Sequence, residues 1–108
     1  MPREVPYIQI AQEHSEIKDE LLASIEKVID HGQFILGPEL DEFEKIFAQL
    51  CQTSHAVGVN SGTDALILSL QALGIGDGDE VITPPNSFVA STSSIIIAGA
   101  KPVFVDVG

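Results

Sequence analysis

Positive charge is scarce in this sequence of 108 residues, because five lysines and arginines stand against 16 aspartates and glutamates, for a formal net charge of −11. Such a chain does not bind nucleic acid or an anionic membrane through bulk electrostatics. Any phosphate group must be held locally, through backbone N–H groups and the N-termini of helices. We therefore expect no nucleic-acid partner and no membrane partner.

Long apolar runs and cysteine pairs are also missing. The longest apolar run, residues 95–98, is far too short to cross a bilayer, and residues 1–15 contain no stretch that resembles a secretion signal. These features predict a cytoplasmic protein. The single Cys51 cannot form an internal disulfide, and we expect it to pack rather than react. The histidines show no metal-ligand spacing with each other or with this cysteine, so no metal site is predicted.

Apolar residues nevertheless make up 44% of the sequence, and the mean hydropathy of +0.25 is above that of a disordered chain. The core-forming segments are continuous apolar runs, which are typical of elements buried on both sides. A chain this short has little to cover them with. We expect the missing cover to come from later residues or from a second subunit.

Two helices are predicted in the first half of the chain. Residues 17–31 place their apolar side chains on one helical face, with Ser15 as the expected N-cap and Gly32 as the stop. A second helix is expected to start at Gly37 and Pro38, because proline suits the first helical position. Its apolar residues continue at helical spacing to Leu50.

The second half reads as alternating strands and helices, which predicts an α/β fold with parallel strands joined by right-handed crossovers. We expect an N-terminal helical segment over residues 1–54 and a sheet domain that begins over residues 55–108. Strands are expected at residues 56–59, 80–83 and 101–106, and helices at residues 63–73 and 88–98, of which the first is almost wholly apolar and expected to be buried.

Two loops follow strands at the edge where ligands bind in an open parallel sheet. In residues 60–64, Gly62 allows close backbone approach, and the Thr63 hydroxyl with the N–H groups that follow suits a phosphate. The second loop, residues 84–88, places Phe88 near the same edge. Ordinary helix capping and a core position for Phe88 are the alternatives. The pairing of a phosphate nest with a flat ring favours a planar phosphorylated cofactor.

A nicotinamide site is disfavoured, because the glycines at 74, 76 and 78 follow a helix and precede a strand, which is the wrong edge of the sheet for the dinucleotide fingerprint. No P-loop sequence is present either. Asp77 and Asp79 lie in a tight turn without a downstream glutamate, so they predict a turn rather than a calcium site.

Five stretches of the chain resemble, in order and at matching intervals, the DegT/DnrJ/StrS-type sugar aminotransferases, within the fold-type I enzymes that use pyridoxal 5'-phosphate (PLP). The resemblance runs from about Tyr7 to the end. The five stretches are FILGPE at 34–39, VNSGTDAL at 59–66, GDGDEVI at 76–82, PNSFVAS at 85–91 and GAKPVFVD at 99–106.

The resemblance implies that the chain is the N-terminal part of such an enzyme, with residues 55–108 starting a three-layer α/β/α cofactor-binding domain. It implies that Gly62, Thr63 and Asp64 hold the PLP phosphate and that Phe88 stacks on the pyridine ring. The loop of residues 33–37 is expected near the substrate at the interface of a homodimer. Its implied substrate-binding residues are Phe34 and Gly37.

The implied reaction passes an amino group, with glutamate as the expected donor, to a nucleotide-linked keto sugar in amino-sugar, polysaccharide or antibiotic biosynthesis. It requires a Schiff-base lysine and an acidic partner for the pyridine nitrogen. In the family both lie later than residue 108, so the chain alone is expected to be inactive. Lys101 precedes a strand, at the edge of the sheet opposite the one where the ligand is expected, so it is expected to be a surface residue. Asp106 is expected to cap a loop. A PLP-dependent sugar dehydratase, with histidine in place of the lysine, and a non-catalytic regulatory relative are the alternatives.

Overall fold

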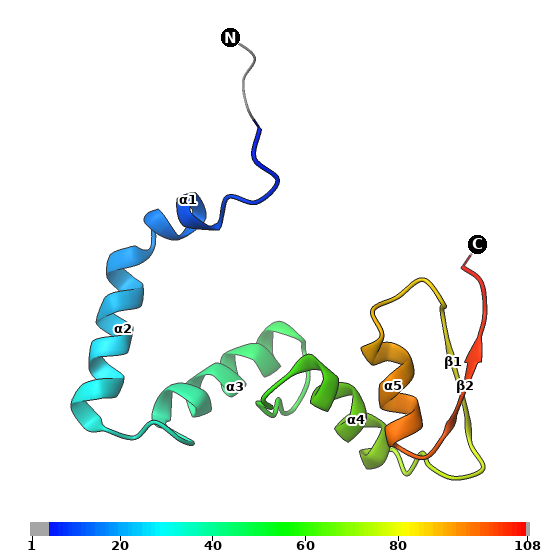
Figure 1. Cartoon of the computed structure of the whole chain (residues 1–108). Helices are drawn as coiled ribbons and strands as arrows, with labels where there is room; N and C mark the ends of the chain where they lie inside the picture. The colour runs from blue at the N-terminus through cyan, green and yellow to red at the C-terminus, as the bar shows by residue number, and fades with distance from the viewer. Residues whose placement is uncertain (1–4, 108) are drawn as a thin grey trace. The chain divides into compact units, whose positions relative to one another are not determined.

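The computed structural model describes residues 5–107 and divides into two compact units, Met1–Ala56 and Val57–Gly108 (Figure 1). The first unit is helical and the second contains the sheet. Among the described residues, none of the helices combines the length and apolar character needed to cross a membrane. The division of the sequence into segments 1–54 and 55–108 stays a prediction.

The first unit contains three helices: α1 (Ile10–Ser15), α2 (Lys18–His31) and α3 (Pro38–Leu50). The sequence patterns did not indicate α1, and the prediction that Ser15 caps α2 is wrong. Ser15 is instead the last residue of α1, where its hydroxyl donates to the Gln12 carbonyl at 2.7 Å. The hydroxyl is therefore turned back onto its own helix, and α2 begins after Ile17 without a side-chain cap.

The other predicted boundaries of the first unit are confirmed. Gly32 ends α2 in the left-handed conformation, with φ 71°, and its N–H donates to the Val28 carbonyl at 3.0 Å. Glycine adopts this conformation at no steric cost, which is why it ends helices so often. Pro38 opens α3, and Glu39 and Asp41 lie in the first turn, where acidic side chains suit the positive end of the helix dipole.

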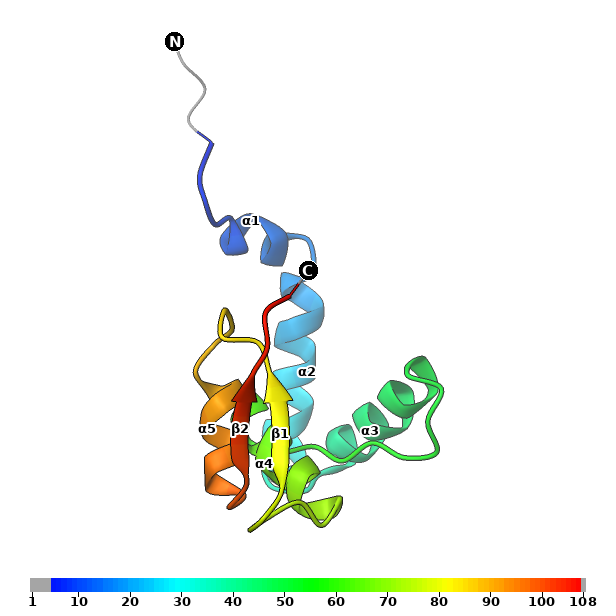
Figure 2. The same ribbon diagram turned by 90° about the vertical axis from the view of Figure 1, so that its right-hand side faces the viewer.

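The second unit contains α4 (Gly62–Ala72), β1 (Glu80–Thr83), α5 (Ala90–Ile97) and β2 (Lys101–Phe104). The strands pair in parallel, with Glu80 beside Lys101 and Thr83 beside Phe104, and both arrows point the same way in Figure 2. The predicted α/β class is confirmed. The helix α5 joins the strands and packs against both, and α4 packs against α5. The helix α5 is two residues shorter than predicted at its start and one at its end, and β2 is two residues shorter at its end.

The predicted strand at residues 56–59 is wrong. The sheet of the described residues consists of β1 and β2, and residues 56–59 lie outside it, with the Val57 side chain 78% exposed. A strand forms only against a neighbouring strand that accepts its ladder of hydrogen bonds. An apolar run is therefore not sufficient by itself to make one.

The core of the second unit lies where α5 meets the sheet, and its buried side chains are small. Ala90, Ile95 and Ala100 are buried there together with the polar Thr83 and Ser94. The expectation that α4 is a buried helix is wrong for this chain, because none of its residues is buried. Its one covered side is the side that packs against α5, so the rest of its apolar surface stays open.

Candidate functional site

The N-terminus of α4 is built by Ser61, the residue before the helix. Ser61 has extended backbone, and its hydroxyl oxygen accepts the Asp64 N–H at 3.1 Å, while its carbonyl accepts the Ala65 N–H at 3.0 Å. The first N–H groups of any helix lack an acceptor within the helix. The cap uses the one on Asp64, so those on Gly62 and Thr63 point forward from the helix end and remain suitable for an anion.

Ser61 is the residue that the predicted set omitted. Its signal was present in the sequence, because a serine followed three residues later by an acidic residue before an apolar run is typical of a helix start. The predicted alternative, ordinary capping, therefore describes Ser61. It does not describe Thr63, whose half-buried side chain lies within the first turn of α4.

Gly62 occupies open space. A Cβ built on this residue meets no atom within 4 Å, and Gly62 is the first residue of a regular helix rather than a residue with positive φ. Neither packing nor backbone conformation within the chain requires glycine here. The absence of a side chain leaves the backbone at this helix end open to close approach by a ligand.

The loop that leads into α5 carries Phe88. The Ser91 N–H donates to the Phe88 carbonyl at 3.0 Å, and the hydroxyls of Ser87 and Ser91 are hydrogen-bonded at 2.8 Å, so the backbone on both sides of Phe88 is fixed. The ring itself is 76% exposed. The alternative that Phe88 belongs to the core is wrong for this chain.

The loops before α4 and α5 lie toward the same edge of the sheet. In both views α4 and α5 run against the direction of the strands, so each helix begins toward the end of the sheet at which β1 and β2 finish (Figures 1 and 2). This is the edge at which parallel sheets bind ligands. Both loops therefore lie toward the edge at which the sequence predicts the cofactor.

Phe34 and Gly37 belong to the other unit, in the loop between α2 and α3. Phe34 is 70% exposed, whereas Gly37 is buried. A Cβ on Gly37 would lie 2.7 Å from the Gln33 carbonyl oxygen, a separation that real Cβ atoms do not tolerate. Packing inside the loop thus explains glycine at this position, and contact of Gly37 with a substrate stays a prediction.

Three charged residues of the second unit have local partners. Lys101 Nζ donates to Glu80 Oε1 at 2.7 Å on the exposed surface, and this hydrogen bond raises the pKa of Lys101. The Asp106 carboxylate accepts the Val107 N–H at 3.0 Å, as expected of a loop cap. Asp79 closes the preceding turn by accepting the Gly76 N–H at 2.9 Å.

Cys51 is an exposed free thiol at the C-terminal end of α3, so the prediction that it packs is wrong. Cys51 follows Leu50, the last residue of the helix, and its side chain is exposed to solvent rather than packed. Exposure alone does not make a cysteine reactive, since reactivity depends on its thiolate fraction.

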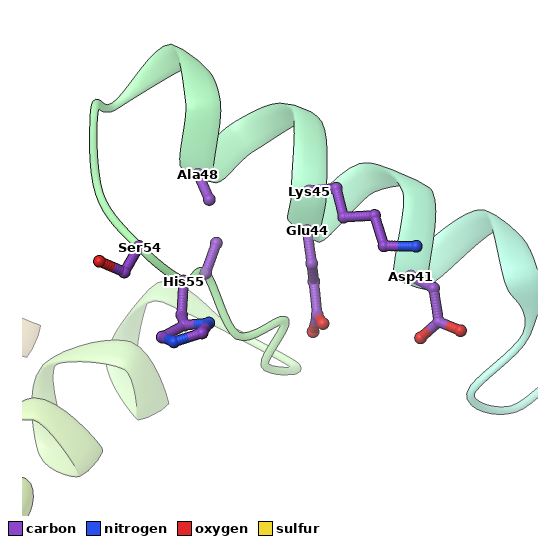
Figure 3. A pocket seen from close by; sticks show the side chains of 7 residues that line it. Asp41, Glu44, Lys45, Ala48, Ser54 and His55 are labelled. Atoms are coloured by element: carbon purple, nitrogen blue, oxygen red, sulfur yellow. The ribbon is translucent and has the colours of Figure 1, made fainter.

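A hollow of about 140 Å³ lies in the first unit, between α3 and the segment that follows it (Figure 3). The side chains of Glu44 and Lys45 project from the helix and His55 from the segment. None of the residues predicted for cofactor or substrate lines it. Its full lining is Asp41, Glu44, Lys45, Ala48, Ser54, His55 and Ala56.

The fold places the chain among α/β proteins with parallel strands, and comparison with known proteins narrows this class. Residues 15–108 match the DegT/DnrJ/EryC1/StrS aminotransferase family. The chain belongs to this family. It is 49% identical over 102 residues to a Streptomyces venezuelae protein named dTDP-3-amino-3,4,6-trideoxy-alpha-D-glucose transaminase, with 94% of this chain and 27% of that protein covered.

A second relative and two solved structures support the same family. A Pseudomonas aeruginosa protein named UDP-2-acetamido-2-deoxy-3-oxo-D-glucuronate aminotransferase is 42% identical over 95% of this chain and 29% of its own length. The crystal structure of S. venezuelae DesV in complex with a ketimine intermediate superposes with a TM-score of 0.93 at 48% identity, covering 100% of this chain and 29% of that one. The structure of NtdA from Bacillus subtilis with bound cofactor PMP gives 0.86 at 35% identity, covering 98% and 25%. The chain thus spans less than a third of the length of these relatives.

Proposed function

We propose that this chain is the N-terminal part of a PLP-dependent aminotransferase that transfers an amino group to a nucleotide-linked keto sugar. Family membership supports the reaction class. The names of relatives support the substrate class, because they describe transaminases or aminotransferases of dTDP- and UDP-linked sugars. The activity, the substrate and the cofactor of the whole protein all belong to this proposal.

The observation that carries the proposal is the helix end at Gly62. Two forward-pointing N–H groups, on Gly62 and Thr63, meet an opening that no side chain fills. A phosphate is one of the anions that such a helix end binds. Since the net charge of −11 provides no general attraction for anions, binding must depend on these local groups.

In the proposed complex, the backbone N–H groups of Gly62 and Thr63 and the Thr63 hydroxyl hold the phosphate. Asp64 supports them from the first turn, where its own N–H is fixed by Ser61. Phe88 lies against the face of the ring and orients it. When bound, PLP supplies the electron sink that amino-group transfer needs. The lysine that must attach it is proposed to lie beyond residue 108, since Lys101 is paired with Glu80 at the start of β2.

The amino donor, the dimer and the location are parts of the same proposal. A relative from Bacillus subtilis, 35% identical, is named 3-oxo-glucose-6-phosphate:glutamate aminotransferase, which supports glutamate as the donor. The many exposed apolar side chains of the chain support a homodimer, in which Phe34 and Gly37 would approach the substrate. A cytoplasmic location is supported by the sequence alone.

A titration of the isotope-labelled chain with pyridoxamine phosphate, followed by amide NMR, tests the proposal. Pyridoxamine phosphate carries no aldehyde and so does not react with surface lysines. Pyridoxamine, which lacks the phosphate, is the matched control. We expect the amide signals of Gly62 and Thr63 to shift with the phosphate compound only, and the ring signals of Phe88 to shift with both. Equal shifts of the Gly62 and Thr63 amide signals with both compounds would contradict the assignment. So would the absence of any shift up to about 1 mM, corresponding to about −4 kcal/mol.

Variants separate the two contacts. Thr63→Ala removes the hydroxyl while Thr63→Ser keeps it, and Phe88→Ala removes the ring while Phe88→Tyr keeps it. We expect each alanine variant to weaken binding by roughly two- to tenfold, which corresponds to one hydrogen bond or one ring contact. Each conservative variant should bind as the unaltered chain does. Because the Phe88 ring is 76% exposed, its removal should leave stability within about 0.5 kcal/mol.

A regulatory role is the second candidate, and the names of two relatives favour it. A protein of Geobacillus stearothermophilus named pleiotropic regulatory protein is 39% identical, and the erythromycin biosynthesis sensory transduction protein EryC1 of Saccharopolyspora erythraea is 40% identical. Glutamate discriminates between the candidates. A polypeptide that continues this chain and binds PLP without converting it to the amino form in the presence of glutamate would favour regulation. A sugar dehydratase would be indicated by histidine in place of the attaching lysine.

A further inference from the structure

The loop between α2 and α3 is closed by a side chain that the proposed reaction does not use. Nδ1 of His31 lies 3.1 Å from the Gln33 backbone nitrogen, and Nε2 lies 3.1 Å from Glu39 Oε1. His31 is the last residue of α2 and Glu39 lies in the first turn of α3. One ring therefore links the two helix ends across the loop.

The two hydrogen bonds define the protonation state of the ring. A backbone N–H can only donate, so Nδ1 must accept from Gln33 and carries no proton. The proton of the neutral ring then lies on Nε2, which donates it to the Glu39 carboxylate. This carboxylate selects that tautomer, as carboxylate partners of histidine commonly do.

The loop inside this link is tight and strained. The Gln33 amide donates from Nε2 to the Leu36 carbonyl at 3.0 Å, and Leu36 has a left-handed backbone with φ 51°. For a residue with a Cβ this conformation costs about 1 kcal/mol or more, so it persists only where the surroundings enforce it. The next residue, Gly37, is in such close contact with the Gln33 carbonyl that no Cβ fits.

The strained loop presents three consecutive apolar side chains to solvent. Phe34, Ile35 and Leu36 are between 70% and 81% exposed. A strained backbone that exposes apolar side chains indicates a surface held ready for contact.

We infer that His31 is a positioning residue that, as the neutral Nε2–H tautomer, holds the 33–37 loop closed and so fixes Phe34 for the substrate. The role of Phe34 in this inference rests on the proposed function, but the closure of the loop does not. Nδ1 is the acceptor of the Gln33 N–H. Loss of this acceptor is therefore expected to open the loop at Gln33.

NMR of the 108-residue chain tests the inference directly. A long-range proton–nitrogen spectrum identifies which nitrogen of the His31 ring bears the proton, and we expect Nε2. Amide hydrogen exchange reports closure, and we expect the protection factor of Gln33 to fall about tenfold when a substitution removes the acceptor at Nδ1, the equivalent of one net hydrogen bond. An Nδ1–H tautomer, or protection of Gln33 that does not change when this acceptor is removed, would overturn the inference.

Two variants of His31 provide a matched pair. In His31→Asn the side-chain oxygen takes the place of Nδ1, so protection of the Gln33 amide should persist. In His31→Gln the side chain still reaches Glu39 but offers no acceptor beside Gln33, so protection should be lost. Equal protection in both variants would overturn the inference. The tautomer of the unaltered chain decides the matter if either variant disturbs α2.

Titration with UDP-glucose distinguishes failure of the inference from failure of the proposed function. If the loop is closed as described but the nucleotide sugar leaves the signals of Phe34 unchanged, the positioning by His31 stands and the substrate role of Phe34 is lost. If Gln33 is unprotected while Gly62 and Thr63 still respond to pyridoxamine phosphate, the inference fails and the proposed cofactor site stands.

Discussion

Replacement of Gly62 by alanine separates what the fold needs at this position from what a ligand needs. The backbone of Gly62 is helical, and an added Cβ meets nothing within 4 Å. Alanine at a compatible position stabilises by about 0.4–1 kcal/mol, because it reduces the freedom of the unfolded chain. We therefore expect Gly62→Ala to raise the free energy of unfolding by this amount.

Gly74, just after the other end of the same helix, provides the control. A Cβ on Gly74 also meets nothing within 4 Å, but its φ is +74°. Alanine in this left-handed conformation costs roughly 1–2 kcal/mol. The same substitution in equally open space is therefore expected to change stability in opposite directions at the two ends of α4. Urea unfolding followed by helical circular dichroism measures both changes.

The ligand-binding assay should rank the two alanine variants in the opposite order to their stability. If a phosphate approaches the Gly62 backbone, the added Cβ occupies its path, and we expect the affinity for pyridoxamine phosphate to fall by about tenfold or more, or about 1.4 kcal/mol. Gly74→Ala should bind as the unaltered chain does wherever it remains folded. Gly62→Ala would thus be the more stable variant and the weaker binder.

Two results would refute this reasoning. Destabilisation by Gly62→Ala would mean that the fold itself requires glycine there, and the open space would no longer indicate a ligand. Unchanged affinity in a stabilised Gly62→Ala variant would mean that the phosphate does not approach this backbone.

Three further changes test local features of the fold. Ser61→Ala should lower the free energy of unfolding by about 1 kcal/mol in urea, and Ser61→Asp should restore it, because the cap needs only an acceptor. Gly37→Ala should cost about 1–3 kcal/mol in the same assay, since its Cβ would collide with the Gln33 carbonyl at 2.7 Å. The pKa of Glu39 is held below its ordinary value of 4.5 by its own backbone N–H first and by His31 second. The stability that the Glu39 carboxylate contributes is present above its ordinary pKa and is lost as pH falls through the lowered pKa. His31→Ala removes one of the causes, so it should move the pKa of Glu39 part of the way back toward its ordinary value, as measured by carbon NMR.

The predictions that succeeded depend on short-range physics. Proline at the start of α3 and glycine at the end of α2 act within one turn of the chain, so their effects can be read directly from sequence. The strand β1 was predicted with its observed bounds because its turn, closed by Asp79, and the following Pro84 delimit it on both sides. The cap at Ser61 also acts within one turn of the chain, so it could have been predicted in the same way.

The predictions that failed depend on partners. The run at residues 56–59 and the helix α4 are apolar enough to be buried, yet Val57 is 78% exposed and Leu68 is 48% exposed. Hydropathy states what a segment prefers and does not state what lies against it. Strand pairing and burial are both properties of a pair of surfaces, so no pattern within one segment determines them.

The same distinction explains why the candidate site was predictable in part. Phosphate binding at Gly62 and Thr63 needs only a helix end and a short loop, both local, and the structure contains them. The link from His31 to Glu39 joins residues eight positions apart across a strained loop, and no periodic pattern indicates it. The tautomer of a histidine is even harder to predict from sequence, because it depends on which group faces each ring nitrogen. The helix end that is proposed to hold a ligand's charge can therefore be predicted from residues in a row, whereas the contact that positions a loop requires coordinates.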